Sequence, residues 1–134
     1  MKTSLLGKTL LLVDDRPENL LSLEALLEAS GATLHKAFSG NEALKWVYTA
    51  SRKPDCILLD VQMPQMSGYE VATLLKGLSA TAAIPVVFVT ASEADNTVVD
   101  PEFADVLSQP VFVHKPLTQQ AVLAALERAV QQKA

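Results

Sequence analysis

Four short apolar runs constrain the fold of this chain more than any other feature of its sequence. They cover residues 10–13, 56–59, 86–89 and 111–113 and consist almost entirely of Val, Ile, Leu and Phe. The runs are continuous, as in strands buried on both faces, whereas a strand with one solvated face alternates apolar and polar residues. A weaker fifth strand is expected at 33–36.

Helical patterns fill the intervals between the expected strands. Pro17 suits the first turn of a helix, and Gly31 suits a helix end. Ser39 and Ser67 are each followed three residues later by Glu, which is the signature of a capping box, and Thr118 can cap a last helix. The apolar positions expected on the buried helix faces are Leu20, Leu23, Leu27, Ala43, Trp46, Val47, Ala50, Val71, Leu74, Leu75, Leu78, Val122, Ala125, Leu126, Ala129 and Val130.

Strand and helix alternate five times along the chain, counting a short helix expected at about 101–107. This alternation predicts an α/β fold with a central parallel sheet and right-handed crossovers. The length of 134 residues fits one domain, and a hydrophobic content of 49% allows a buried core. The same composition excludes a disordered tail and a small disulfide-stapled protein.

The charge balance argues against two classes of partner. The chain has 11 basic and 15 acidic residues, a net charge of −4. Non-specific electrostatic binding to nucleic acid or to an anionic membrane is therefore not expected. The apolar stretches are far shorter than the ~20 residues that span a bilayer. Cys56 is the single cysteine, so an internal disulfide is excluded. We therefore expect a cytoplasmic protein.

Polar side chains follow each apolar run at the point where the expected strand ends. Asp14 and Asp15 end the first run, Asp60 the run at 56–59, Thr90 the next, and Lys115 the last. Ligands of open α/β sheets bind outside the carboxyl ends of the strands, at the point where the strand order reverses. If the strand order is 2-1-3-4-5, the three carboxylates meet in one cleft and the hydroxyl and the amine approach it from the other side.

Three carboxylates in one cleft require cations. Two of them about 4 Å apart repel by ~4 kcal/mol at an effective dielectric constant near 20. Oxygen ligands with no His or Cys beside them favour Mg²⁺, which in turn holds phosphate. Asp60 stands alone on the central strand and is the candidate nucleophile for an aspartyl-phosphate. Lys115 would neutralise one phosphoryl oxygen, and the Thr90 hydroxyl would donate a hydrogen bond to another.

These landmarks resemble the receiver domain of two-component response regulators. The resemblance runs from about Lys8 to Val130 and rests on four stretches: 12–15 (Leu-Val-Asp-Asp), 58–64 (Leu-Leu-Asp-Val-Gln-Met-Pro) with Gly68, 90–91 (Thr-Ala) and 115–116 (Lys-Pro). It implies a flavodoxin-like (βα)5 three-layer sandwich with a parallel five-stranded sheet in the order 2-1-3-4-5. It also implies one receiver domain over 1–134, with a core at about 8–130.

The resemblance implies a role for each site residue. Asp60 would be the phosphoacceptor. Lys115 would pair with the phosphate, and the peptide bond between Lys115 and Pro116 would be cis. A bound Mg²⁺ or Mn²⁺ would be held by the carboxylates of Asp14, Asp15 and Asp60 and by the backbone carbonyl of Gln62. The phosphoryl group would contact Thr90 and the backbone of Ala91, and Phe112 would be the switch aromatic residue.

The function that follows is that of a phosphorelay receiver. A sensor histidine kinase or a histidine phosphotransfer protein would supply the phosphoryl group, and a partner-binding surface would respond. The module would assist its own phosphorylation and dephosphorylation without being an enzyme, and would be a monomer or a weak dimer. Two alternatives stay open: a Mg-dependent phosphatase that acts through an aspartyl-phosphate, and a receiver-like docking domain that never takes phosphate. The phosphatase would need an acid where Gln62 stands.

Overall fold

A single parallel sheet organises the molecule. The computed structural model describes residues 5–90, 111–115 and 117–133. In chain order its elements are β1 (Thr9–Val13), α1 (Pro17–Leu27), the 3-10 turn η1 (Glu28–Ser30), β2 (Thr33–Ala37), α2 (Gly40–Thr49), β3 (Cys56–Asp60), α3 (Gly68–Lys76), β4 (Val86–Thr90), β5 (Val111–His114) and α4 (Gln119–Lys133). The five strands are parallel in the order β2-β1-β3-β4-β5, which confirms the expected fold class and strand order.

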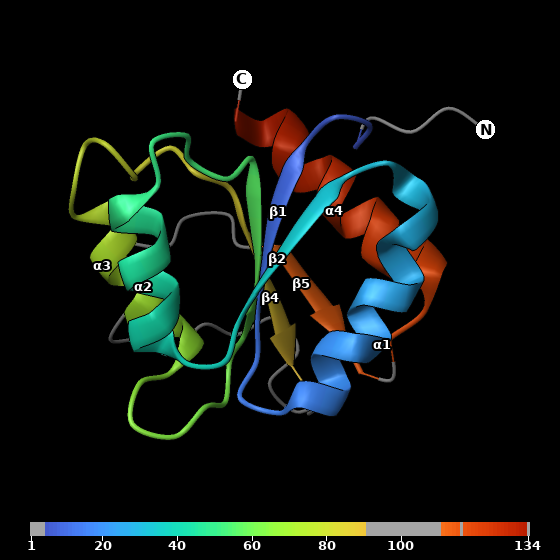
Figure 1. The fold of residues 1–134 in the computed structure, drawn as a ribbon, viewed down its shortest axis with the longest axis horizontal. Coiled ribbons are helices and arrows are strands. Elements are labelled where there is room, and N and C mark those ends of the chain that lie inside the picture. Colours follow the sequence, from blue (N-terminus) through green and yellow to red (C-terminus); the bar gives the residue numbers. More distant parts are fainter. Residues whose placement is uncertain (1–4, 91–110, 116, 134) are drawn as a thin grey trace.

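The helices form a layer on each side of the sheet. Figure 1 shows the sheet nearly edge-on, with α1 and α4 on one side and α2 and α3 on the other. Successive strand residues point to opposite faces, so each strand supplies both layers. Leu10 and Leu12 of β1 belong to the core cluster under α1 and α4, whereas Leu11 and Val13 belong to the cluster under α2 and α3. Each central strand is therefore buried on both faces, and this is why its sequence is a continuous apolar run.

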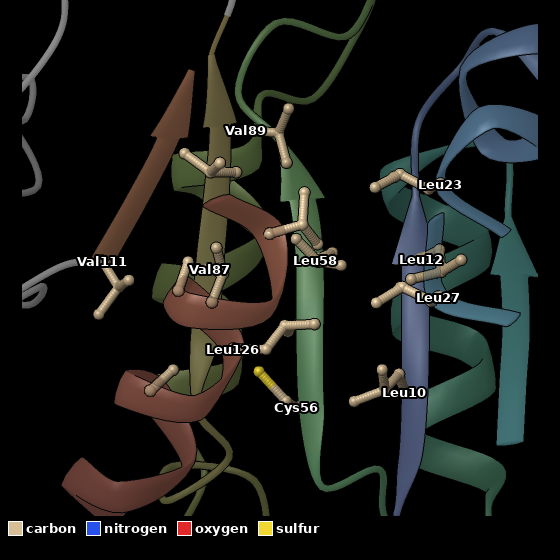
Figure 2. Close-up of a cluster of buried hydrophobic side chains, with 14 of the residues drawn as sticks. Leu10, Leu12, Leu23, Leu27, Cys56, Leu58, Val87, Val89, Val111 and Leu126 are labelled. Carbon is tan, nitrogen blue, oxygen red and sulfur yellow. The ribbon is translucent and has the colours of Figure 1, made fainter. Parts of the chain in front are cut away.

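The cluster under α1 and α4 is tightly filled. Figure 2 shows Leu126 of α4 beside Cys56, with Leu23 and Leu27 of α1 over β1. Cys56 is fully buried, and that burial raises the pKa of its thiol to about 12. The thiol therefore serves as a small apolar side chain in this layer.

The helix starts follow the expected side-chain signals. Ser67 and Glu70 form a complete capping box at the start of α3. The Ser39 hydroxyl caps α2 by accepting a hydrogen bond from the Glu42 N–H, but the Glu42 carboxylate accepts from the Phe38 N–H instead of closing the box on Ser39. These bonds satisfy amide groups that a helix start leaves without partners.

One part of the expected buried surface is wrong. Leu74 and Leu78 are 46% and 49% exposed, whereas Val71 and Leu75 are buried as expected, and Tyr69 and Ala72 complete the buried face of α3. The buried face of α3 is centred on Ala72 and Leu75, so Leu74 falls on the exposed side of the helix, and α3 ends at Lys76, before Leu78 is reached. The helix expected at 101–107 lies outside the described residues, as do Ala91 and Pro116.

Three strands, β3, β4 and β5, run one residue further than their apolar runs. Asp60 is the last residue of β3, and Thr90 is the last residue of β4. The sheet itself therefore positions these polar side chains. Within the described ranges, no helix has the length and apolar character that a membrane crossing requires.

Candidate functional site

The register of the sheet places the first and third strand ends side by side. Val13 of β1 pairs with Leu59 of β3, so the next residues, Asp14 and Asp60, are neighbours at the carboxyl edge. Lys115 joins them from β5, where its N–H donates to the carbonyl oxygen of Thr90. The expected convergence of these residues is what the structure shows.

The three carboxylates form one compact cluster. Each of Asp14, Asp15 and Asp60 offers an oxygen atom, and these oxygens lie within 4.8 Å of one another. Asp14 and Asp60 are buried, at 2% and 5% exposure, while Asp15 is half-buried. The Lys115 Nζ lies 3.8 Å from Asp14 Oδ2 and 3.8 Å from Asp60 Oδ1, so one amine faces two carboxylates.

A cavity opens over the cluster. It has a volume of about 420 Å³ and is lined by Asp15, Arg16, Asn19, Asp60, Gln62 and Lys115. Its walls are strongly polar, and it reaches the candidate nucleophile. A small anionic group can therefore reach Asp60 from solvent, with the amine of Lys115 beside its path.

The environment of Asp60 disfavours its charged form. Burial raises the pKa of its carboxyl to about 6, and repulsion from Asp14 and then from Asp15 adds to that effect. The charge of Lys115 and a hydrogen bond from the Gln62 backbone act in the opposite direction on this pKa. A divalent cation beside Asp60 would remove most of the penalty, because it favours the ionised form.

The carboxylates fit Mg²⁺ by their chemistry and spacing. Magnesium prefers oxygen ligands at about 2.0–2.1 Å, so ligand atoms on opposite sides of the ion are about 4.2 Å apart. Oxygens within 4.8 Å of one another can hold such an ion directly or through water, and Mg²⁺ usually keeps several of its waters. The described residues of the cluster contribute no softer His or Cys ligand.

A glycine allows the next helix to approach the nucleophile. A Cβ on Gly68 would overlap the backbone carbonyl oxygen of Asp60 and lie 3.1 Å from the Val61 Cα. The Gly68 N–H donates to the Val61 carbonyl oxygen at 2.9 Å. Between them, Gln65 has a φ of 72°, in the left-handed region that non-glycine residues rarely adopt. The loop that carries Gln62 is thus tightly folded against the end of β3.

Thr90 and Phe112 lie on the other face of the sheet edge. Phe88 pairs with Phe112 and Thr90 pairs with His114, so the two-residue period places Thr90 and Phe112 on one face as diagonal neighbours. Thr90 is buried and Phe112 is half-buried. The Phe112 ring is 5.6 Å from the Phe88 ring, which in turn packs on Tyr69 at 5.1 Å.

One residue of the site was missed at the level of sequence. Asn19, in the first turn of α1, donates from its amide Nδ2 to Asp14 Oδ2 at 3.1 Å. The sequence feature that could have identified Asn19 is its position, five residues after Asp14 and in the first turn of the expected helix. The N-cap residue of that helix, Arg16, makes no side-chain capping bond. That signal is weak, because Asn near a helix start is common for local reasons.

Comparison with known proteins agrees with this geometry. The sequence model of the response regulator receiver domain matches residues 10–127. The chain belongs to this family. The receiver is therefore a phosphorelay signalling module, a phosphoacceptor rather than an ordinary enzyme.

Individual relatives cover most of the fold. The polar-differentiation response regulator DivK of Brucella ovis is 39% identical over 84 residues, which are 63% of this chain and 67% of DivK. The receiver domain of a signal transduction histidine kinase from Syntrophus aciditrophicus superimposes with a TM-score of 0.76 at 26% identity, covering 94% of this chain and 92% of that one.

A third relative carries a metal. The receiver domain of the sensor histidine kinase PA1611 from Pseudomonas aeruginosa has a TM-score of 0.77 at 23% identity, covering 93% of this chain and 98% of that one. It was crystallised with a magnesium ion coordinated in its active-site cleft. At this identity the likeness concerns the fold.

Proposed function

We propose that Asp60 accepts a phosphoryl group from a phosphohistidine, assisted by Mg²⁺ or Mn²⁺ held at Asp14, Asp15, Asp60 and the backbone carbonyl of Gln62. The observation that carries this proposal is the joint placement of three carboxylates and one amine. Their oxygens lie within 4.8 Å of one another, and the Lys115 Nζ lies 3.8 Å from two of the carboxylates. A family member with this arrangement has both a nucleophile and the charges that neutralise a phosphoryl group.

The transfer step assigns one task to each side chain. An ionised oxygen of Asp60 bonds to phosphorus, the bond from phosphorus to the donor histidine breaks, and its electron pair stays on the imidazole nitrogen. The Lys115 amine stabilises one phosphoryl oxygen, while the Thr90 hydroxyl and the Ala91 N–H donate to the others. The metal, when bound, neutralises negative charge that develops on the phosphoryl oxygens. The same residues position a water for hydrolysis, so the module assists both gain and loss of its phosphate.

The readout of phosphorylation uses the opposite face of the sheet edge. A phosphoryl group adds a charge of about −1.5 to −2 beside Asp60 and draws the Thr90 hydroxyl toward it. Phe112, diagonal to Thr90 on that face, then packs further inward. Such a change is a shift between two populations, biased by the new charge, and it alters the surface that a partner contacts.

The proposed donor is a sensor histidine kinase or a histidine phosphotransfer protein in the cytoplasm. Family membership supports the class of donor. The placement of Cys56 is compatible with a reducing compartment, because its thiol is fully buried and free.

Labelling with acetyl phosphate tests the nucleophile. The chain should take up one phosphoryl group, and EDTA should prevent this. Asp60→Asn should abolish labelling, whereas Asp55→Asn, the same chemical change on a carboxylate that accepts from the Thr9 N–H, should retain it. Full labelling of the Asp60→Asn variant would contradict the assignment. Many turnovers on small phosphomonoesters would instead indicate a phosphatase.

Thr90→Ala tests the readout. This variant should still be labelled, but the change around Phe112 should be lost. Aromatic NMR signals of Phe112, followed with beryllofluoride in place of phosphate, report the change directly. Identical signals in the activated variant and the activated wild type would contradict coupling through Thr90.

A further inference from the structure

A second cavity lies behind the acidic cluster and shares a wall with it. It has a volume of about 410 Å³ and is lined by Asp14, Asn19, Ser22, Leu23, Ala25, Leu26, Lys115 and Leu117. Asn19 and Lys115 line both cavities. These two side chains therefore separate the polar cavity over Asp60 from a largely apolar groove along α1.

Asp14 also lines the second cavity, and its carboxylate accepts two hydrogen bonds from residues at the start of α1. The Arg16 N–H donates to Oδ1 at 2.9 Å, and the Asn19 Nδ2 donates to Oδ2 at 3.1 Å. The first bond closes a local turn of the kind that Asp side chains favour, and the second fixes the rotation of the carboxylate about its own axis. The carboxylate is 2% exposed, so water contributes little to its solvation.

The second donor also affects Lys115. The Lys115 Nζ lies 3.8 Å from Asp14 Oδ2, the same oxygen that Asn19 contacts, and 3.8 Å from Asp60 Oδ1. Without the Asn19 amide, Asp14 Oδ2 would be buried with no hydrogen-bond donor from α1, and the Lys115 amine, 3.8 Å away, would be the nearby cation. A buried carboxylate oxygen that loses its donor keeps the cost of desolvation, so a closer approach of the amine to that oxygen becomes more favourable. Lys115 would then be drawn to Asp14 and away from Asp60.

We propose that Asn19 is a positioning residue for phosphorylation, which orients Asp14 as a ligand of the metal and leaves the Lys115 amine available to Asp60. The inference rests on the proposed function of the site. Asn19 touches neither Asp60 nor the reacting phosphoryl group in this assignment and acts through Asp14.

Metal affinity tests this role without any phosphodonor. Asn19→Leu removes the amide while it keeps the branching of the side chain, and it should weaken Mg²⁺ binding about tenfold, as measured by calorimetric titration. Asn19→Ala provides the same test without added bulk, in case the leucine side chain prevents folding. Asn19→Gln keeps an amide donor and should restore Mg²⁺ affinity to within about threefold of wild type.

Ser22→Leu is the matched control. Ser22 lines the same groove one turn further along α1, and no described hydrogen bond joins it to Asp14. This variant should keep the wild-type Mg²⁺ affinity. If Asn19 served only the stability of α1, its substitution would lower the melting temperature and leave the Mg²⁺ affinity of the folded protein unchanged.

The rate of labelling at saturating Mg²⁺ provides the second measurement. Asn19→Leu and Asn19→Ala should remain several-fold slower than wild type with acetyl phosphate, because saturation with metal does not return Lys115 to Asp60. Folded Asn19→Leu and Asn19→Ala variants with Mg²⁺ affinity and labelling rate within twofold of wild type would overturn the inference. Failure of the wild-type chain itself to bind Mg²⁺ or take up phosphate would instead overturn the proposed function.

Discussion

The ionised carboxylate of Asp60 should lower the stability of the folded protein at neutral pH. Burial and the neighbouring carboxylates raise the pKa of Asp60 from 3.8 to about 6. A pKa that is higher in the folded state means that the folded protein binds the proton more tightly than the unfolded chain does. The destabilisation is therefore lost as pH falls below about 4, grows as pH rises from 4 to 6, and is complete above about pH 6 in the absence of metal.

The size of the effect follows from these two pKa values. A pKa of 3.8 in the unfolded chain and about 6 in the folded protein corresponds to a destabilisation of ~3 kcal/mol at pH 7.5 and of ~1 kcal/mol at pH 4.3. Asp60→Asn keeps the shape of the side chain and removes the charge. We therefore expect the variant to be more stable than wild type by ~3 kcal/mol at pH 7.5, or by about 10 °C in melting temperature, and by only ~1 kcal/mol at pH 4.3.

Urea unfolding in EDTA at these two pH values measures the difference and avoids the region near the isoelectric point of about 5.1. Asp55→Asn is the control and should change the free energy of unfolding by less than about 1 kcal/mol, because an amide oxygen can still accept from the Thr9 N–H. Added Mg²⁺ should stabilise wild type more than Asp60→Asn. Equal stability of wild type and Asp60→Asn at pH 7.5, or a gain that does not depend on pH, would refute the reasoning.

Substitutions at three further positions test the loop and the core. Gly68→Ala should destabilise the fold by ~2 kcal/mol or more and slow acetyl phosphate labelling, because its Cβ would overlap the Asp60 carbonyl oxygen; wild-type behaviour in both assays would show that the loop adjusts freely. At position 65, where φ is 72°, Gln65→Gly should be more stable than Gln65→Ala by ~1 kcal/mol in urea unfolding, and the reverse order would rule out backbone strain there. Leu126→Ala should lower the free energy of unfolding by ~2–5 kcal/mol, since Leu126 is 0% exposed; a loss below about 1 kcal/mol would mean that the core closes around the gap.

Much of the site could be anticipated because its residues are tied to strand ends. Asp60 and Thr90 are the last residues of β3 and β4, so a burial pattern and a change to polar residues locate them along the chain. The sequence pattern did not establish the strand order, because no local pattern shows which strands pair. Gln62 and Phe112 entered through family resemblance, and their roles stay proposals.

Other features could not be predicted from the sequence because they depend on packing between helices and strands. The exposure of Leu74 follows from the rotation of α3, which buries the side around Ala72 and Leu75 and which the apolar spacing alone does not define. The bond from Asn19 to Asp14 depends on the angle at which α1 leaves β1. The need for glycine at position 68 arises from its approach to the backbone of Asp60.

The sequence by itself determined the strands, the helix caps and the presence of acids and a lysine at successive strand ends. These features are local, because the period of the side chains and the hydrogen bonds of a cap involve residues a few positions apart. Only the tertiary structure decided that the Lys115 amine lies 3.8 Å from both Asp14 and Asp60, and that Asn19 shares Asp14 with it. Those distances join segments up to a hundred residues apart in the chain, and they are set by the register of the sheet and by the packing of α1 and α4 against it.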